Sequence, residues 1–290
     1  MRHTEPLRLR TEDGVRIDAC HQPPADGATE LGIVVAHGFS GSWRQPRQRR
    51  IAGVLAGTAG VVCLDFRGHG RSGGHSTVGD REILDVAAAV AAAREFGYRR
   101  VATLGFSMGA SVTLRHAGLI GGIDAIAAVS GPGRWYFRGT PPMRRLHWVV
   151  EDPVGRLVGR LLLGIRIGAR RWADTPRLPM DLVDAPATEP GVPAVAPAPG
   201  VPAAEPANGV PVPPAVAAGL ISPTPLLIVH GDRDPYFPVG HAHGLYDAAR
   251  HPKQLWIERG YGHAEGAATP RLIHRIAAWL RDAAAGSTGD

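Results

Sequence analysis

Ser107 lies in the middle of a G-x-S-x-G pattern, residues 105–109. An apolar run with strand character, 101–104, precedes the pattern, and a segment that can continue as a helix, 111–117, follows it. A serine at such a sharp strand-to-helix turn is held in a strained backbone conformation that exposes its hydroxyl. Because G-x-S-x-G also arises by chance, the strand before it and the helix after it are what make Ser107 a candidate nucleophile.

A serine hydroxyl is a poor nucleophile at neutral pH, so it needs a nearby base and an acid that orients that base. In a parallel sheet, reactive groups collect at the carboxyl ends of the strands. Beyond Ser107, two strand ends carry candidates: Asp234, four residues after a strand that ends at His230, and His263, in the loop after the last strand. We therefore predict Ser107 as nucleophile, His263 as base and Asp234 as the orienting acid.

Other residues near these positions offer alternative chemistry. Asp232 competes for the role of the orienting acid, and His37 is a second candidate base. We expect Asp232 to fix the turn in which it lies and His37 to orient the loop at 38–39. His241 and His243 suggest a metal site, but no carboxylate or cysteine stands at a fitting spacing. For these two histidines we expect a solvated helix start and no metal.

A glycine-rich loop, residues 65–74, follows one of the predicted strands. It opens no helix with a G-x-G-x-x-G pattern, so nucleotide binding is not expected. We expect its Asp65, Arg67 and His69 to hold the loop in place through hydrogen bonds and not to contact substrate.

The elements that must position the candidate residues follow from the hydrophobic pattern. Runs rich in apolar residues are typical of strands buried on both faces, and they lie at 31–36, 61–64, 123–129 and 225–231. Helical patterns lie between and after these runs, at 43–57, 80–96, 239–250 and 270–284. Strands that alternate with helices at this spacing predict an α/β protein with a parallel sheet covered on both faces.

The alternation breaks between residues 131 and 221, which divides the chain. We expect residues 1–130 and 222–290 to form a catalytic domain and residues 131–221 to form a cap inserted between strands six and seven. Proline and alanine dominate residues 185–218 almost to the exclusion of aromatic residues. Such a segment cannot bury enough apolar area to offset the entropy lost on ordering, so we expect it to be disordered or extended.

The first part of the predicted cap contains one apolar helix stripe with arginines beside it. Its members recur at spacings of three and four residues: Val154, Leu157, Val158, Leu161, Leu162 and Ile165. Our first interpretation packs this stripe on the sheet domain above a pocket. A second makes 154–165 a basic amphipathic helix in peripheral contact with a membrane or with lipid substrate. We favour the first.

Five features together resemble the α/β-hydrolase superfamily of serine hydrolases, in that family's order along the chain. They are H-G-F at 37–39, the loop 65–72, the Ser107 motif, G-x-x-D-x-x-x-P at 231–238, and G-H at 262–263. The set is similar to bacterial esterases, monoglyceride-lipase-like enzymes and proteins with serine-aminopeptidase-type domains. It covers about residues 5–130 and 222–285. The resemblance implies an α/β-hydrolase fold with a mostly parallel eight-stranded sheet and helices on both faces.

The resemblance also implies roles for single residues. The family's oxyanion hole maps onto the backbone N–H groups of Phe39 and Met108, which would stabilise a tetrahedral intermediate. The D-x-x-x-P spacing places the acid at Asp234 ahead of Asp232. No metal or organic cofactor is implied.

Apolar side chains near the predicted site indicate the substrate class. Phe39, Phe106 and Phe237 favour an apolar acyl or alcohol group, with Phe106 and Phe237 as pocket residues, so a small-molecule carboxylic ester is the expected substrate. The same residues on the same fold also serve peptidases or amidases, thioesterases and acyltransferases, and the fold occurs in non-catalytic binding modules. The pocket decides among these.

Composition limits the remaining partners. The 290 residues have a net charge of +6, with Lys253 the only lysine among scattered arginines, so no nucleic-acid partner is expected. We find no signal-peptide pattern and no apolar run long enough to span a bilayer. Cys20 and Cys63 show no paired spacing. We expect a cytoplasmic protein with reduced thiols; the sequence leaves its oligomeric state open.

Overall fold

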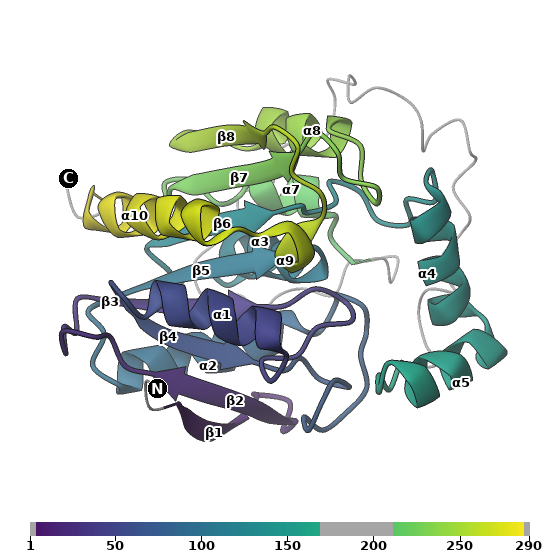
Figure 1. The fold of residues 1–290 in the computed structure, drawn as a ribbon, viewed down its shortest axis with the longest axis horizontal. Helices are drawn as coiled ribbons and strands as arrows, with labels where there is room; N and C mark the ends of the chain where they lie inside the picture. The colour runs from purple at the N-terminus through teal and green to yellow at the C-terminus, as the bar shows by residue number, and fades with distance from the viewer. Residues whose placement is uncertain (1–3, 169–210, 287–290) are drawn as a thin grey trace.

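The computed structural model describes residues 4–168 and 211–286. Its strands are β1 (Glu5–Arg10), β2 (Arg16–Gln22), β3 (Leu31–Ala36), β4 (Gly60–Leu64), β5 (Arg100–Phe106), β6 (Ala125–Val129), β7 (Leu226–Gly231) and β8 (Lys253–Glu258). They form one eight-stranded sheet in the order β1-β2-β4-β3-β5-β6-β7-β8 (Figure 1). The β1–β2 and β2–β4 pairs are antiparallel, and all other neighbours are parallel. The predicted fold class is confirmed.

Helices cover both faces of this sheet (Figure 1). On one face lie α1 (Pro46–Leu55), α9 (Ala264–Ala267) and α10 (Pro270–Gly286), and on the other lie α2 (Ile83–Glu95), α3 (Met108–Leu119), α7 (Pro214–Ala218) and α8 (Gly240–Ala248). Each face has its own apolar core, because the parallel strands send successive side chains to opposite sides. This explains why β3 to β7 are rich in apolar residues along their whole length.

Two helices, α4 (Pro141–Glu151) and α5 (Pro153–Leu162), follow β6 and precede β7 in the chain. They lie beyond the carboxyl ends of the parallel strands (Figure 1). We call this helix pair the cap; the division of the chain into domains at 130 and 222 stays a prediction. Among the described residues, no helix is long and apolar enough to cross a bilayer.

Part of the segment expected to lack regular structure is folded. Residues 185–210 lie outside the described residues, but the expectation is wrong for Pro214–Ala218, where α7 forms with Ala217 and Ala218 fully buried. The cause is close packing of small residues. A side chain at Gly118 of α3 would overlap the carbonyl oxygen of Ala217, so α7 and α3 approach to backbone contact there.

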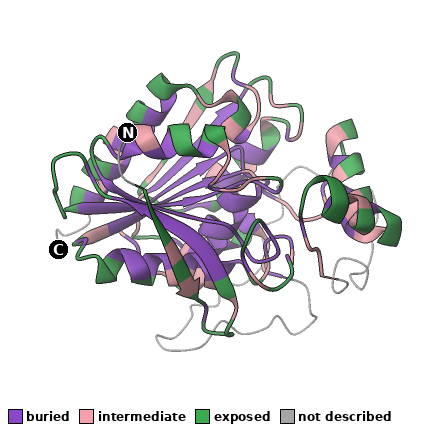
Figure 2. Ribbon diagram, turned by 60° about the horizontal axis from the view of Figure 1, so that its bottom comes forward, coloured by how far each residue is buried: buried purple, intermediate pink, exposed green. Residues whose placement is uncertain are grey.

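Our favoured interpretation of the stripe in α5 is also wrong. Val154, Leu157, Leu161 and Leu162 are exposed, and only Ile165, beyond the helix, is fully buried. In Figure 2 the cap lies at one end of the fold, with exposed residues over much of its surface. The apolar side of α5 therefore does not pack on the sheet domain.

The two cysteines lie on neighbouring strands. Cys20 and Cys63 are buried, directly opposite each other on β2 and β4, and both are free thiols.

The turn between β5 and α3 depends on two glycines. Ser107 has φ 51° and ψ −115°, in the positive-φ region that side chains rarely adopt. A Cβ atom on Gly109 would overlap the carbonyl oxygen of Ala36 and lie 2.6 Å from that of His37. A Cβ on Gly105 would overlap the backbone of Gly109. Helix α3 thus begins against the end of β3, and only glycine permits this approach.

Replacing Gly109 by alanine should lower the free energy of unfolding by roughly 1–3 kcal/mol, because the new methyl group must displace the backbone at 36–37. The matched control is Gly244→Ala in α8, where a Cβ meets nothing within 4 Å. Alanine's better helix propensity should raise stability there by up to about 1 kcal/mol. Urea unfolding followed by circular dichroism measures both; equal effects of the two changes would contradict the close approach at Gly109.

Candidate active site

Ser107, His263 and Asp234 form one chain of hydrogen bonds. The Oγ atom of Ser107 lies 2.9 Å from Nε2 of His263, and Nδ1 of His263 lies 2.7 Å from Oδ2 of Asp234. An ionised carboxylate only accepts, so Nδ1 carries the proton and Nε2 accepts from the serine hydroxyl. The structure thus brings together three side chains that sequence reasoning took from separate strand ends.

Asp234 is held in place by the backbone that follows it. Its side chain is fully buried, and its Oδ1 accepts the N–H groups of Tyr236 at 2.8 Å and Phe237 at 3.1 Å. Burial raises the pKa of Asp234, but the hydrogen bonds from His263 and from these two N–H groups outweigh it, so the pKa lies below its ordinary value. Asp234 is therefore an anion at neutral pH.

Asp232 and His37, the alternative acid and base, form hydrogen bonds with backbone groups of neighbouring loops. Oδ1 of Asp232 accepts the N–H of Gly260 at 2.6 Å, which ties two loops together. Nδ1 of His37 donates to the carbonyl oxygen of Gly38 at 2.7 Å, and its Nε2 accepts the N–H of Phe66 at 3.1 Å. Burial and a neighbouring histidine lower the pKa of His37 to about 3, so the ring stays neutral and structural.

The expectation of a solvated helix start at 241–243 is wrong for one of its histidines. His243 is exposed, but His241 is buried beside the rings of Phe137 and Phe237. Its Nδ1 accepts the N–H of Gly133 at 3.1 Å. Burial lowers its pKa to about 4, so it is neutral. The described residues contain no group of three or more His, Cys, Asp or Glu side chains that could hold a metal ion.

The glycine-rich loop is anchored by its polar side chains. Asp65 accepts the backbone N–H of Trp43 at 2.7 Å, and Arg67 pairs with Asp85 and with Asp13. Nε2 of His69 lies 2.7 Å from the carbonyl oxygen of Phe39. These contacts join the loop to its neighbours, and none of the three side chains lines the two cavities described below.

Backbone strain gathers around the hydrogen-bonded chain. Ser107, Ser130 and Ala264 have φ values of 51°, 52° and 48°. The N–H of Ala264, which follows His263, donates to Oγ of Ser130 at 3.1 Å, so a hydrogen bond links two residues with strained backbone angles. Side-chain-bearing residues keep such angles only where their surroundings hold them, and they cluster at functional sites.

Two backbone donors lie beside the serine. The N–H groups of Phe39 and Met108 donate to no acceptor within the described ranges, and both residues line the same cavity as Ser107. Met108 is the first residue of α3, so its N–H has no partner inside the helix. Free donors at this point are suited to an oxygen that gains negative charge.

Sequence reasoning missed Glu265, which holds the loop carrying Phe39. Its Oε1 accepts the backbone N–H of Gly38 at 2.6 Å and Nε2 of Gln48 at 2.8 Å. Burial raises the pKa of Glu265, although the N–H of Gly38 opposes the shift. The only sequence signal was its position two residues after His263, which does not distinguish it from a solvated carboxylate.

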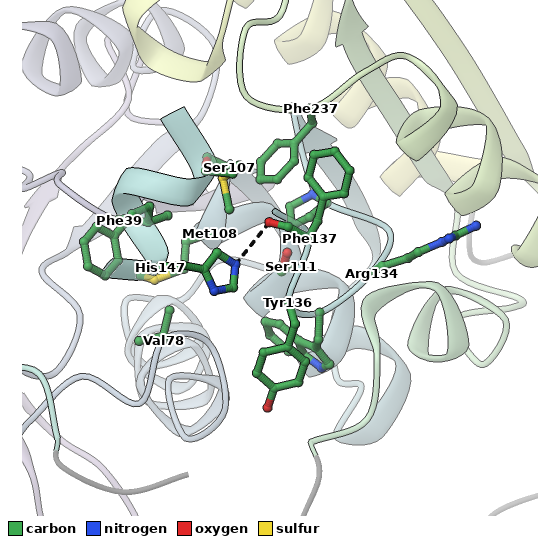
Figure 3. Close-up of a pocket in the computed structure, with 14 residues that line it drawn as sticks. Phe39, Val78, Ser107, Met108, Ser111, Arg134, Tyr136, Phe137, His147 and Phe237 are labelled. Carbon is green, nitrogen blue, oxygen red and sulfur yellow. Dashed lines mark hydrogen bonds between the residues drawn. The ribbon is translucent and has the colours of Figure 1, made fainter. Parts of the chain in front are cut away.

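A narrow apolar cavity of about 50 Å³ opens at Ser107 (Figure 3). The walls include Phe39, Phe237 and, from the cap and the segment before it, Phe137, Met143, Leu146 and His147. His147 lies at 3.1 Å from the carbonyl oxygen of Phe137, the contact dashed in Figure 3. The cap therefore completes this cavity.

The two predicted pocket residues have different places. Phe237 lines the narrow cavity and its ring centre lies 5.7 Å from that of His263. Phe106 does not line it: the side chain is fully buried in the core under α1 and α10. Strand alternation is the reason, because the residue just before the turn points to the opposite face from the cavity. Tyr236, missed in the sequence, stacks on His263 with ring centres 4.2 Å apart.

A wider cleft of about 560 Å³ reaches Ser107 and His263 from another side. Its lining includes Phe39 and Glu265 from the main body and Met143, Arg145, Leu146, Val149 and Leu163 from the cap. Two cavities of unequal size thus meet at the serine hydroxyl, one narrow and apolar, the other wide and partly charged.

Comparison with known proteins agrees with this geometry. A family model described as "Alpha/beta hydrolase family" matches residues 33–274. The chain is 30% identical over 223 residues to a monoacylglycerol lipase of Mycolicibacterium smegmatis, a match that covers 74% of each chain.

Solved structures show the same fold at low sequence identity. An esterase of Pyrococcus furiosus matches with a TM-score of 0.66 at 19% identity, over 97% of this chain and 93% of that one. The esterase domain of a Rhodothermus marinus protein matches with a TM-score of 0.60 at 17% identity, over 97% and 99%.

Replacing Glu265 by alanine should lower kcat about tenfold to a hundredfold, because the Gly38 N–H loses its buried acceptor and the Phe39 donor shifts. Glu265→Gln keeps an acceptor oxygen and should restore most of the activity. Steady-state kinetics on a soluble ester separates the two effects, since KM should change little. If kcat falls as far in Glu265→Gln as in Glu265→Ala, the site requires the negative charge of Glu265 and not only its acceptor oxygen.

Proposed function

This chain belongs to the alpha/beta hydrolase family and is a hydrolase, and from that premise we propose that it cleaves carboxylic esters through Ser107. The observation that carries the proposal is the unbroken hydrogen-bonded chain from Ser107 through His263 to Asp234. Its proton positions are those that a serine nucleophile requires.

In the first half-reaction, Oγ of Ser107 attacks the ester carbonyl carbon, and Nε2 of His263 takes the hydroxyl proton. The imidazolium that forms is stabilised by the anionic Asp234, which also fixes the tautomer. The carbonyl oxygen, now an oxyanion, accepts the free N–H groups of Phe39 and Met108. When the intermediate collapses, the C–O bond to the alcohol breaks and His263 returns the proton to the leaving oxygen.

In the second half-reaction, water attacks the acyl-enzyme while His263 takes one of its protons. The ester bond to Ser107 then breaks, the serine regains its proton from His263, and the carboxylic acid leaves. No step needs a metal or an organic cofactor.

The relatives support an ester as the substrate class. The relative at 30% identity is a monoacylglycerol lipase, which makes an ester of an alkyl acid the nearest model for this chain. The cavities agree, because an apolar pocket and a wider cleft on either side of Ser107 suit the two unequal halves of an ester.

Ser107→Ala should abolish hydrolysis of p-nitrophenyl esters and labelling by a fluorophosphonate, because no other described hydroxyl contacts His263. Asp234→Asn should lower kcat by about three to four orders of magnitude, since an amide stabilises the wrong histidine tautomer. Asp232→Asn is the matched control, and its kcat should stay close to that of the wild type. Labelling of the Ser107→Ala variant, or equal losses for the two aspartates, would overturn the assignment.

The unequal cavities predict unequal size limits on the two sides of the ester bond. In one ester series the acid lengthens while the alcohol stays constant, and in the other the alcohol lengthens. We expect kcat/KM to fall steeply with length in one series and only gradually in the other, since about 50 Å³ holds only a short chain. Parallel decline in both series would show that the two cavities do not separate the halves of the substrate.

A further inference from the structure

The outward side of α5 is the largest group of exposed apolar side chains in the cap. Val154, Leu157, Leu161 and Leu162 are 54–78% exposed, and Leu163 just beyond the helix is 47% exposed. We call these five residues the α5 apolar face. Single exposed apolar residues are ordinary on a protein surface, but a contiguous group of this kind marks an interaction site.

The α5 apolar face points outward because α5 packs on the rest of the cap through two glycines on its opposite side. Gly155 and Gly159 are buried against α4. A Cβ atom on Gly155 would lie 2.9 Å from the Cα atom of Val149, and one on Gly159 would lie 2.9 Å from its Cγ1 atom. The two helices thus pack at nearly backbone distance, and this packing leaves the large side chains of α5 without a neighbour in the main body.

The segment that contains the α5 apolar face is rich in arginine. Residues 134–168 carry seven arginines against the two carboxylates Glu151 and Asp152, so most of the chain's net charge of +6 belongs to this segment. Arg156 and Arg160 lie on α5 itself, on the flank next to Leu157 at helical spacing. An apolar helix face with arginines along its edge is complementary to an anionic lipid surface.

The α5 apolar face is continuous with the wide cleft at the active site. Leu163 belongs to both, and Val149 and Arg145 of α4 line the same cleft together with Ser107 and His263. A surface that touched the α5 apolar face would therefore lie at the entrance of the cleft.

We propose that the α5 apolar face docks on the surface of an anionic lipid bilayer, with Arg156 and Arg160 at the level of the lipid phosphates. The leucines enter the boundary between headgroups and acyl chains, and the cleft opens toward the lipid. A second copy of the chain fits less well, because a two-fold contact would bring the same arginines from both copies together. The docking itself does not depend on the proposed ester hydrolysis.

Vesicle co-sedimentation of the full chain tests the proposal. The protein should bind vesicles that contain phosphatidylglycerol at low salt, bind vesicles of phosphatidylcholine alone much less, and detach as salt rises. The double variant Leu157→Asp, Leu161→Asp should lose at least tenfold in vesicle affinity. Arg156→Gln with Arg160→Gln should weaken binding several-fold and flatten the salt dependence.

Val216→Asp is the matched control, because Val216 of α7 is 54% exposed, as is Leu157, and lies in a different part of the fold. It should bind vesicles like the wild type. The Leu157→Asp, Leu161→Asp variant should keep its circular dichroism spectrum and its activity on a water-soluble ester, since neither residue lines a cavity.

Three outcomes would overturn the proposal. They are no binding of the wild type to anionic vesicles at low salt, an equal loss in Val216→Asp, or sedimentation as a dimer that only the leucine variant dissociates. The last would assign the α5 apolar face to a second copy of the chain. Ser107→Ala should bind vesicles normally, so failure of the proposed catalysis and failure of docking give different results.

Discussion

The close approach of helix α3 to the end of strand β3 fixes the geometry of the site. Gly109 passes so near the carbonyl groups of Ala36 and His37 that a single methyl group would not fit. This contact places Met108, at the start of α3, beside the loop that leaves β3 and carries Phe39. Two backbone donors from distant parts of the chain thus come to one cavity. The strained angle of Ser107 is a consequence of the same crossing.

Buried polar side chains hold the loops around that crossing. His37 and His69 bind backbone groups on either side of Phe39, and Glu265 ties Gly38 to the loop that carries His263. Most of these groups use their hydrogen-bonding atoms fully, and a buried polar group that loses its partner destabilises the fold. The polar network therefore positions the three side chains and two N–H groups to which we assign the proposed chemistry.

The sequence was sufficient to predict features that are marked by a local motif or by the order of motifs along the chain. Ser107 is marked by its turn glycines, and Asp234 and His263 by the rule that parallel strands end at one edge. The parallel strands themselves are marked by segments rich in apolar residues. Features that depend on which side of an element faces inward were not predictable. Phe106 points away from the cavity, and α5 packs through Gly155 and Gly159 and not through its leucines. Glu265 was missed because its partner Gly38 is 227 residues away.

The position of α4 links the two halves of substrate selection. Met143 and Leu146 line both the narrow cavity and the wide cleft, so one helix forms a shared wall between them. A change that enlarges the room for one half of a substrate alters the room for the other. Substitutions in α4 can change the substrate range without altering the hydrogen-bonded chain at Ser107. They cannot change the narrow cavity and the wide cleft independently, because α4 lines both. Under the proposed function, selection for a new acid at this helix is also selection on the alcohol.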